Sequence, residues 1–243
     1  MLLALPSDSM SAILGDLAGD EDANDPLLAP IDPMQEVWAT GVTYMRSREA
    51  RKLESHVADV YEHVYDAERP ELFFKSIGWR VVGSDGSVRI RKDSTWNVPE
   101  PELVLVINSF GEIVGYTCGN DVSSRDIEGE NPLYLPQAKL YDGSCSVGPA
   151  LVLADADSLG DITIGLGIMR NDSEIFSGET STSKMKRRFP DLAHYLLTEY
   201  SAPQGVMLMT GTGIVPPDDF SLAIGDRIRI NVGTLSLVNV VAG

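Results

Sequence analysis

Short segments rich in β-branched residues follow one another along most of the chain, and turn residues separate them. Such segments are shorter than ordinary helices, so each is expected to pair with neighbours in a sheet. We therefore expect a β-rich α+β fold, in which a few helices lie at the periphery. The expected strands are 36–44, Val104–Asn108, Ile113–Thr117, Ala150–Ala154, Ile162–Met169, Val206–Met209, Arg227–Val232 and Leu235–Val241.

Helical patterns are few. Apolar residues recur at helical spacing from Ser47 to Ala67, with Pro70 just beyond, and a second helix is expected over Phe189–Tyr200. Residues 1–35 form a short N-terminal appendage with one small helix at Ser9–Leu17 and an acidic link near residues 20–26. Residues 36–243 are expected to form one domain, because no linker or repeat interrupts them.

Charge and motif content exclude several functions. The net charge of −17 argues against nucleic acid and anionic membrane surfaces as partners. The N-terminal apolar run is too short for a signal peptide and no segment resembles a membrane span, so we expect a soluble cytoplasmic protein with two free thiols, Cys118 and Cys145. Only three histidines occur, without a zinc motif, a nucleophile elbow or a phosphate-binding loop. Oxygen ligands are therefore the expected ligand chemistry.

Two glutamates stand at the start of the most apolar strand, in "NVPEPELVLVIN". Strand alternation places Glu100 and Glu102 on one face, where two like charges repel and are costly to desolvate. Pro99 and Pro101 lack N–H groups and confine this stretch to a sheet edge or terminus. The two acids are then either exposed strand-capping residues or ligands of a hard cation such as Mg²⁺ or Mn²⁺.

A third carboxylate follows in "GYTCGNDVSSRD". The intervening "NSFGE" predicts a hairpin turn at Gly111, which returns Asp121 to the start of the first strand. Asp121 is thus a candidate third ligand. Asp126 is its competitor, and an ordinary "ND" turn is the plainer interpretation.

One lysine, Lys139, lies in the Pro- and Gly-rich segment "LYLPQAKLYDGS". Apolar neighbours on both sides favour partial burial over the usual surface location. Near a bound cation, its ammonium could bind a substrate carboxylate or stabilise an enolate.

These motifs together resemble the fumarylacetoacetate hydrolase family. The matching segments, in family order, are "PEPELVLVIN", "GYTCGNDVSSRD", "LPQAKLYDGSCSVGPALV", "FSGETST" and "GTGIVPPDDFSLAIGDRIRI". The resemblance implies a mixed β-roll, a homodimer or dimer-based oligomer, and residues 36–243 as the catalytic domain. It also implies Mg²⁺, with Mn²⁺ or Ca²⁺ as alternatives, on Glu100, Glu102 and Asp121. Substrate contacts are implied for Lys139, Gln137 and Thr212.

One departure from the family pattern concerns the water-activating dyad of its hydrolases, "GxNYxxHxxE". The aligned segment is "GVTYMRSREA", in which Thr43, Ser47 and Ala50 replace the Asn, His and Glu. Serine is no general base near neutral pH, so loss of the dyad disfavours classical acylpyruvate hydrolysis.

Other segments, "EVWATGVTYMRSREAR", "ERPELFFK" and "STWNVPEPEL", resemble the family branch that contains 2-keto-3-deoxy-D-arabonate dehydratase. This implies a small 2-keto-3-deoxy sugar acid as substrate and dehydration through a metal-stabilised enolate. The branch usually has more residues before the shared core, so a shortened chain or a reduced lid is expected.

Proton transfer is assigned to Glu71, which precedes an apolar patch that could raise its pKa; the alternative is an exposed turn residue. Arg46 is a candidate for binding a sugar-acid oxygen, and Arg125 for bracing the Asp121 loop. Two other functions remain open. One is an isomerase, tautomerase, decarboxylase or C–C hydrolase acting on an unsaturated 2-oxo diacid of the 2-hydroxyhepta-2,4-diene-1,7-dioate or acylpyruvate type. The other is a non-catalytic scaffold.

Overall fold

Two β-sheets form the body of the protein. The computed structural model describes residues 2–17, 27–47, 49 and 63–243. Six strands form one sheet in the order β2-β1-β11-β5-β6-β8, and five form the other in the order β10-β9-β12-β13-β3. A short pair, β4 and β7, makes a third. The strands are β1 Glu36–Gly41, β2 Glu71–Ile77, β3 Ser87–Arg89, β4 Asn97–Val98, β5 Pro101–Ile107, β6 Ile113–Asp121, β7 Ser123–Ser124, β8 Cys145–Leu153, β9 Thr163–Arg170, β10 Ser173–Ser181, β11 Val206–Met209, β12 Arg227–Val232 and β13 Leu235–Ala242.

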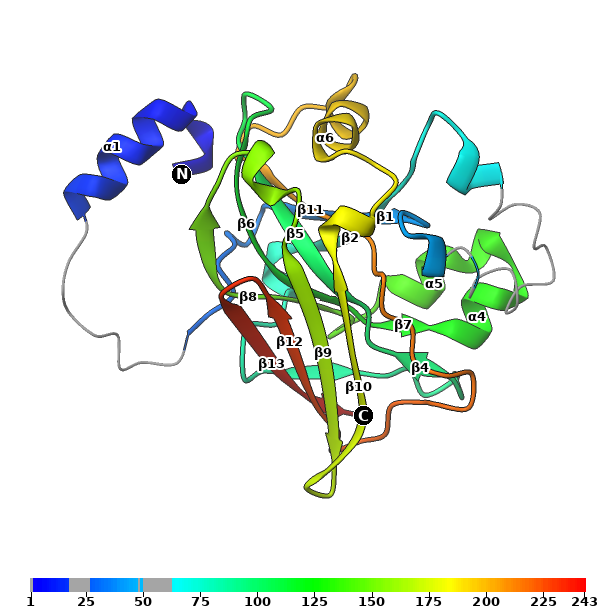
Figure 1. Cartoon of the computed structure of the whole chain (residues 1–243). Helices are drawn as coiled ribbons and strands as arrows, with labels where there is room; N and C mark the ends of the chain where they lie inside the picture. The colour runs from blue at the N-terminus through cyan, green and yellow to red at the C-terminus, as the bar shows by residue number, and fades with distance from the viewer. Residues whose placement is uncertain (1, 18–26, 48, 50–62) are drawn as a thin grey trace.

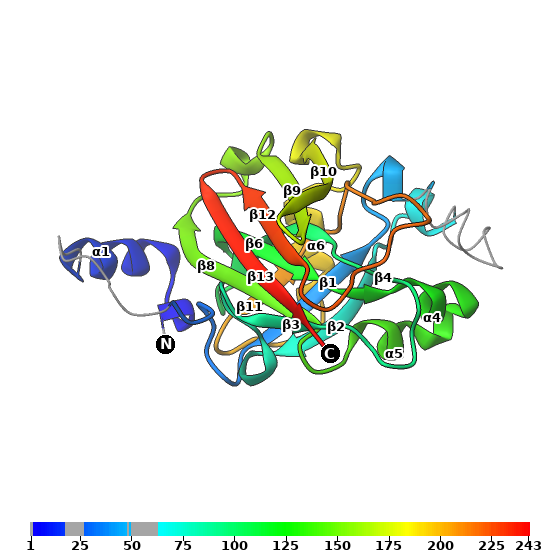
Figure 2. The ribbon, with the colours of Figure 1, turned by 90° about the horizontal axis from the view of Figure 1, so that it is seen from below.

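The sheets pack against each other (Figures 1 and 2), and the main core lies between them. Leu105 of β5, Ile168 of β9 and Ile230 of β12 are fully buried in this core. Helix α6 (Phe189–Leu197) covers one end of it with Leu192 and Leu196, which are four residues apart and therefore share a helix face. The β-rich α+β expectation is confirmed.

Strand β5 is buried on both faces. Leu103, Leu105 and Ile107 enter the main core, whereas Val104 belongs to a second apolar cluster on the opposite side of the sheet. The two faces of the run "LVLVI" thus fill separate cores, as period-two alternation requires. This double burial fixes the register of β5, because a slip of one residue would exchange the faces.

The N-terminal segment packs onto the far end of the β5–β6 hairpin. Helix α1 (Ser7–Leu17) begins two residues earlier than expected. Leu3 and Met10 contact Val106 and Val114, and the backbone N–H of Ser109 donates to the Leu3 carbonyl. In Figure 1 the remainder of α1 extends away from the sheets.

Most expected strands are present, with boundary shifts of a few residues. The first ends at Gly41 instead of residue 44, because Val42 adopts a positive φ of 53°. Strands β2 and β10, and the short strands β3 and β7, were not expected. Residues 45–47 and 63–66 are helical, and the rest of the predicted Ser47–Ala67 helix lies outside the described residues. No helix in the described part of the chain is long and apolar enough to cross a membrane.

Two short helices lie beside the N-terminal end of β5, where Glu100 and Glu102 are located. Helix α4 (Arg125–Glu130) follows β7 directly and α5 (Leu135–Lys139) comes soon after it, and both views place the two helices together near β4 (Figures 1 and 2). They bring Arg125 and Lys139 towards the start of β5.

Candidate metal centre and active site

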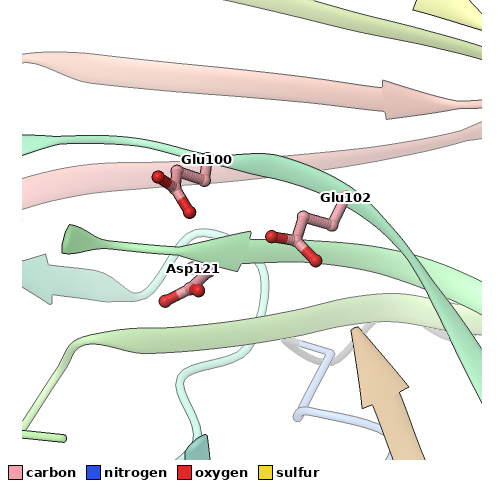
Figure 3. A group of neighbouring side chains, drawn as sticks. All are labelled: Glu100, Glu102 and Asp121. Carbon is pink, nitrogen blue, oxygen red and sulfur yellow. The ribbon is translucent and has the colours of Figure 1, made fainter. Parts of the chain in front are cut away.

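Three buried carboxylates meet where β5 begins and β6 ends. The hairpin pairs Pro101 with Asn120, and the Asp121 N–H donates to the Glu100 carbonyl at 3.0 Å. One oxygen each from Glu100, Glu102 and Asp121 lies within 4.8 Å of the others. Figure 3 shows the three carboxylate groups on one side of the hairpin. The predicted approach of Asp121 to the glutamates is confirmed.

Three cationic side chains balance this charge. Lys139 Nζ lies 2.7 Å from Glu100 Oε2 and 2.8 Å from Asp121 Oδ2. Lys75 Nζ lies 2.5 Å from Asp121 Oδ1, and Arg125 lies 3.3 Å from Glu100 Oε1. All three cations are at most 2% exposed. Arg125 thus ties the segment that follows Asp121 to Glu100.

Glu102 differs from the other two acids, since no ion pair joins it to a described residue. Its Oε2 accepts a hydrogen bond of 2.6 Å from the Gly211 N–H. Burial raises the pKa of Glu102 well above its usual value, and the charges of Asp121 and Glu100 raise it further. Gly211 has a φ of 89°, and a Cβ at this position would overlap Thr43 Oγ1. Only glycine can present its N–H in this way.

The cluster fits a hard divalent cation. Its donors are carboxylate oxygens, which Mg²⁺ prefers. Asp121 Oδ1 is buried, and its ion pair with Lys75 lacks hydrogen-bond geometry, so a lone pair remains available to a cation. A dication would also offset the repulsion that raises the Glu102 pKa. Burial raises the pKa of the adjacent Cys145 thiol to about 12, so no ready thiolate accompanies the acids. Glu100, Glu102 and Asp121 are the residues that would hold the ion.

A small cavity adjoins the cluster. Its walls include Glu71, Lys139, Ser47 and Thr212, which come from four separate segments. Lys139 is the only cationic side chain among the described residues that line it. A larger cavity of ≈ 500 Å³ lies between α6 and the β5–β6 turn, but its lining contains none of the predicted site residues.

Glu71 is not an exposed turn residue. It is the first residue of β2, it is half-buried, and it stands opposite Gly41 of β1. A Cβ at position 41 would overlap the Glu71 carboxylate, so the acid occupies space that only glycine leaves.

Two predicted substrate contacts are not brought to this cavity. Arg46 is exposed and does not line it. Gln137 is also exposed, and its backbone carbonyl accepts a hydrogen bond from Arg91. Asp126, the alternative third ligand, instead accepts hydrogen bonds from Ser94 and Thr95. These positions depend on side-chain directions at the ends of short helices, which motif order does not specify.

The positions of the hydrolase dyad are also informative. Ser47 is buried at the cavity, whereas Thr43 donates its hydroxyl to the Thr210 carbonyl at 2.6 Å. Position 50 lies outside the described residues. Ser47, which is expected at the position of the hydrolase histidine, therefore lies at the cavity wall.

Sequence reasoning missed two buried charged residues at this site. Lys75 interrupts the apolar run "ELFFKSI" of β2, and Glu128 of α4 lines the cavity. A lysine within an otherwise apolar strand is the signal that could have revealed Lys75, because lysine is rarely buried without a partner.

Comparisons with known proteins agree with these observations. Residues 36–242 match the model described as "Fumarylacetoacetate (FAA) hydrolase C-terminal". The chain is 44% identical over 238 residues to a Haloferax volcanii protein named "Probable 2-keto-3-deoxyxylonate dehydratase", covering 94% of this chain and 82% of that one. It is 45% identical over 215 residues to the 2-dehydro-3-deoxy-D-arabinonate dehydratase of Saccharolobus solfataricus, covering 85% and 72%.

A solved structure is similar as well. It is a 2-keto-3-deoxy-D-arabinonate dehydratase complexed with magnesium and 2,5-dioxopentanoate. The TM-score is 0.79 at 38% identity, and the match covers 95% of this chain and 79% of that chain.

Proposed function

Because the chain belongs to the fumarylacetoacetate hydrolase family, we propose that it is a Mg²⁺-dependent dehydratase of 2-keto-3-deoxy sugar acids. The observation that carries this proposal is the buried carboxylate cluster beside a cavity in which Ser47 replaces the hydrolytic histidine. The magnesium and 2,5-dioxopentanoate of the similar dehydratase structure support it.

The reaction removes a proton from C3 and hydroxide from C4, which leave together as water. The resulting unsaturated 2-oxo acid tautomerises to 2,5-dioxopentanoate. When bound, Mg²⁺ supplies Lewis acidity that makes the C3 proton of a 2-oxo acid more acidic. Glu100, Glu102 and Asp121 would hold the ion.

Lys139 and Thr212 are the proposed substrate contacts. The Lys139 ammonium is buried at the cavity wall, where it can bind a carboxylate or stabilise negative charge that develops on the substrate. The Thr212 hydroxyl is partly engaged with the backbone of Ile214 at 3.2 Å. Arg46 and Gln137 were also expected to contact substrate. Both are exposed and neither lines the cavity, so the structure does not support that role.

Glu71 is the proposed general acid and base. It lines the same cavity as Lys139, from strand β2, whereas Lys139 comes from helix α5. One carboxyl group can take the C3 proton and return a proton to the departing hydroxyl, since both steps occur on adjacent carbons.

Action on an unsaturated 2-oxo diacid is the weaker alternative. A diacid would require a second cation for its distal carboxylate. Among the described residues that line the cavity, Lys139 is the sole cation. The polar walls formed by Ser47, Glu71, Glu128 and Thr212 suit the hydroxyl groups of a sugar acid better.

The substrate proposal predicts a specific product. With Mg²⁺, the purified protein is expected to convert 2-keto-3-deoxy-D-arabinonate to 2,5-dioxopentanoate, followed by NMR, and to lose this activity after chelation. The C4 epimer tests stereochemistry in parallel. Turnover of 2-hydroxyhepta-2,4-diene-1,7-dioate without any turnover of the sugar acids would refute the dehydratase assignment.

Glu71→Gln is expected to lower kcat by about 10²–10⁴-fold, the usual contribution of a positioned general acid or base. Mg²⁺ affinity, measured by calorimetry, is expected to stay within about twofold because Glu71 is outside the carboxylate cluster. Glu68→Gln, an exposed acid three residues away, is the matched control. If Glu128→Gln, and not Glu71→Gln, abolished turnover, the proton-transfer role would belong to Glu128.

We further propose a cytoplasmic homodimer or dimer-based oligomer. The two cysteines, Cys118 and Cys145, are buried and free, which suits a reducing compartment. Sedimentation velocity provides the check on assembly: a single species at the 26.3 kDa monomer mass would contradict it.

A further inference from the structure

Lys75 is a fully buried lysine that the proposed reaction does not use. It lies on β2 and is 1% exposed. Its ammonium lies 2.5 Å from Asp121 Oδ1 and donates to the backbone carbonyls of Lys139 at 2.6 Å and Val122 at 3.2 Å.

Two N–H groups of the ammonium donate to these carbonyls, and its charge faces Asp121 Oδ1 in an ion pair that lacks hydrogen-bond geometry. These contacts also join three segments: β2, the chain just after β6, and the C-terminal end of α5. Lys75 is not among the residues that line the cavity, so it has no direct route to substrate. Its effect on chemistry must pass through the groups that it holds.

Both groups belong to the proposed site. Lys75 and Lys139 form ion pairs with the two different oxygens of the Asp121 carboxylate, Oδ1 at 2.5 Å and Oδ2 at 2.8 Å. The rotation of this carboxylate is therefore fixed from both sides. The same Lys75 ammonium binds the backbone carbonyl of Lys139, which also accepts the Ser144 hydroxyl at 2.8 Å. One buried charge thus sets the positions of a candidate ligand and of the lysine that faces the substrate.

We propose that Lys75 is a positioning residue, which orients Asp121 for the cation and anchors the backbone of Lys139 relative to it. The inference rests on the proposed function for the roles of Asp121 and Lys139. Groups that orient ligand side chains commonly change metal affinity or activity by about 10–100-fold when they are removed.

Lys75→Met tests this by removing the ammonium while keeping the aliphatic stem. The expected result is Mg²⁺ affinity about 10–100-fold weaker by calorimetry on the chelator-treated protein, together with a fall in kcat. Lys75→Arg keeps the charge, but a planar guanidinium cannot reproduce the same three contacts. It is therefore expected to weaken Mg²⁺ binding by about tenfold or more. This second variant also serves if Lys75→Met does not fold.

A matched control separates positioning from general stability. Asp226 is a fully buried partner of Arg170 on the other sheet, in a pair of 2.7 Å. Asp226→Asn is expected to lower the melting temperature and leave Mg²⁺ affinity unchanged. Wild-type Mg²⁺ affinity in either Lys75 variant would overturn the proposal. Because calorimetry with Mg²⁺ alone needs no substrate, this result stands apart from any failure of the dehydratase assignment.

Discussion

Glu102→Gln is expected to abolish measurable Mg²⁺ binding and sugar-acid turnover, yet to leave the protein folded. Glu102 is buried and is repelled by Asp121 and Glu100, so loss of its charge relieves strain between like charges. The amide oxygen of Gln can still accept the Gly211 N–H. The bound cation, however, loses the attraction of one carboxylate charge. Two unit charges 4 Å apart attract each other by about 4 kcal/mol at an effective dielectric of about 20, which corresponds to about 10³-fold in Mg²⁺ affinity.

Calorimetric titration with Mg²⁺ and a thermal melt are the measurements. The expected signature is lost binding with a melting temperature equal to or above that of the wild type in chelator. Asp126→Asn is the matched control, because this acid follows the same hairpin but bonds to Ser94 and Thr95 instead. Wild-type Mg²⁺ affinity in Glu102→Gln, or its loss in Asp126→Asn, would show that the cation binds elsewhere.

Lys139→Met is expected to reduce kcat by about 10²–10³-fold, the range for removing one preorganised electrostatic group from a site. The protein should also be destabilised without metal by about 3–5 kcal/mol, since Glu100 and Asp121 lose a buried partner. Added Mg²⁺ would restore part of the missing positive charge. The variant is therefore expected to gain more in melting temperature from Mg²⁺ than the wild type does.

Paired melts with chelator and with saturating Mg²⁺ test this prediction, alongside steady-state kinetics. Lys92→Met, at an exposed lysine, is the control for loss of a positive charge. Undiminished kcat in Lys139→Met would remove Lys139 from the reaction, even if the melts behaved as expected.

Local patterns predicted the parts of this protein that depend on local geometry. The alternation in β5 and the hairpin turn at Gly111 were enough to place Asp121 beside Glu100. The cation partners could not be placed in this way. Lys75 reaches Asp121 only because β2 joins the sheet through β1 and β11, pairings between segments far apart in sequence.

The direction of individual side chains was the second feature that could not be predicted from the sequence. Motif order placed Gln137 and Lys139 in one segment, but the short helix α5 buries Lys139 and exposes Gln137. Strand β10 escaped prediction because its sequence, "SEIFSGETS", is mostly polar; it lies at the edge of its sheet, where most of its side chains are exposed or half-buried.

The close approach of Glu71 to Gly41 has a consequence for recognising similar chains. Any side chain at position 41 would displace the carboxylate at position 71. The two positions are thirty residues apart in sequence but opposite each other on β1 and β2. A chain that keeps this acid in this place must keep the glycine too. In similar chains, an acid at the position of Glu71 is therefore expected to occur together with glycine at the position of Gly41.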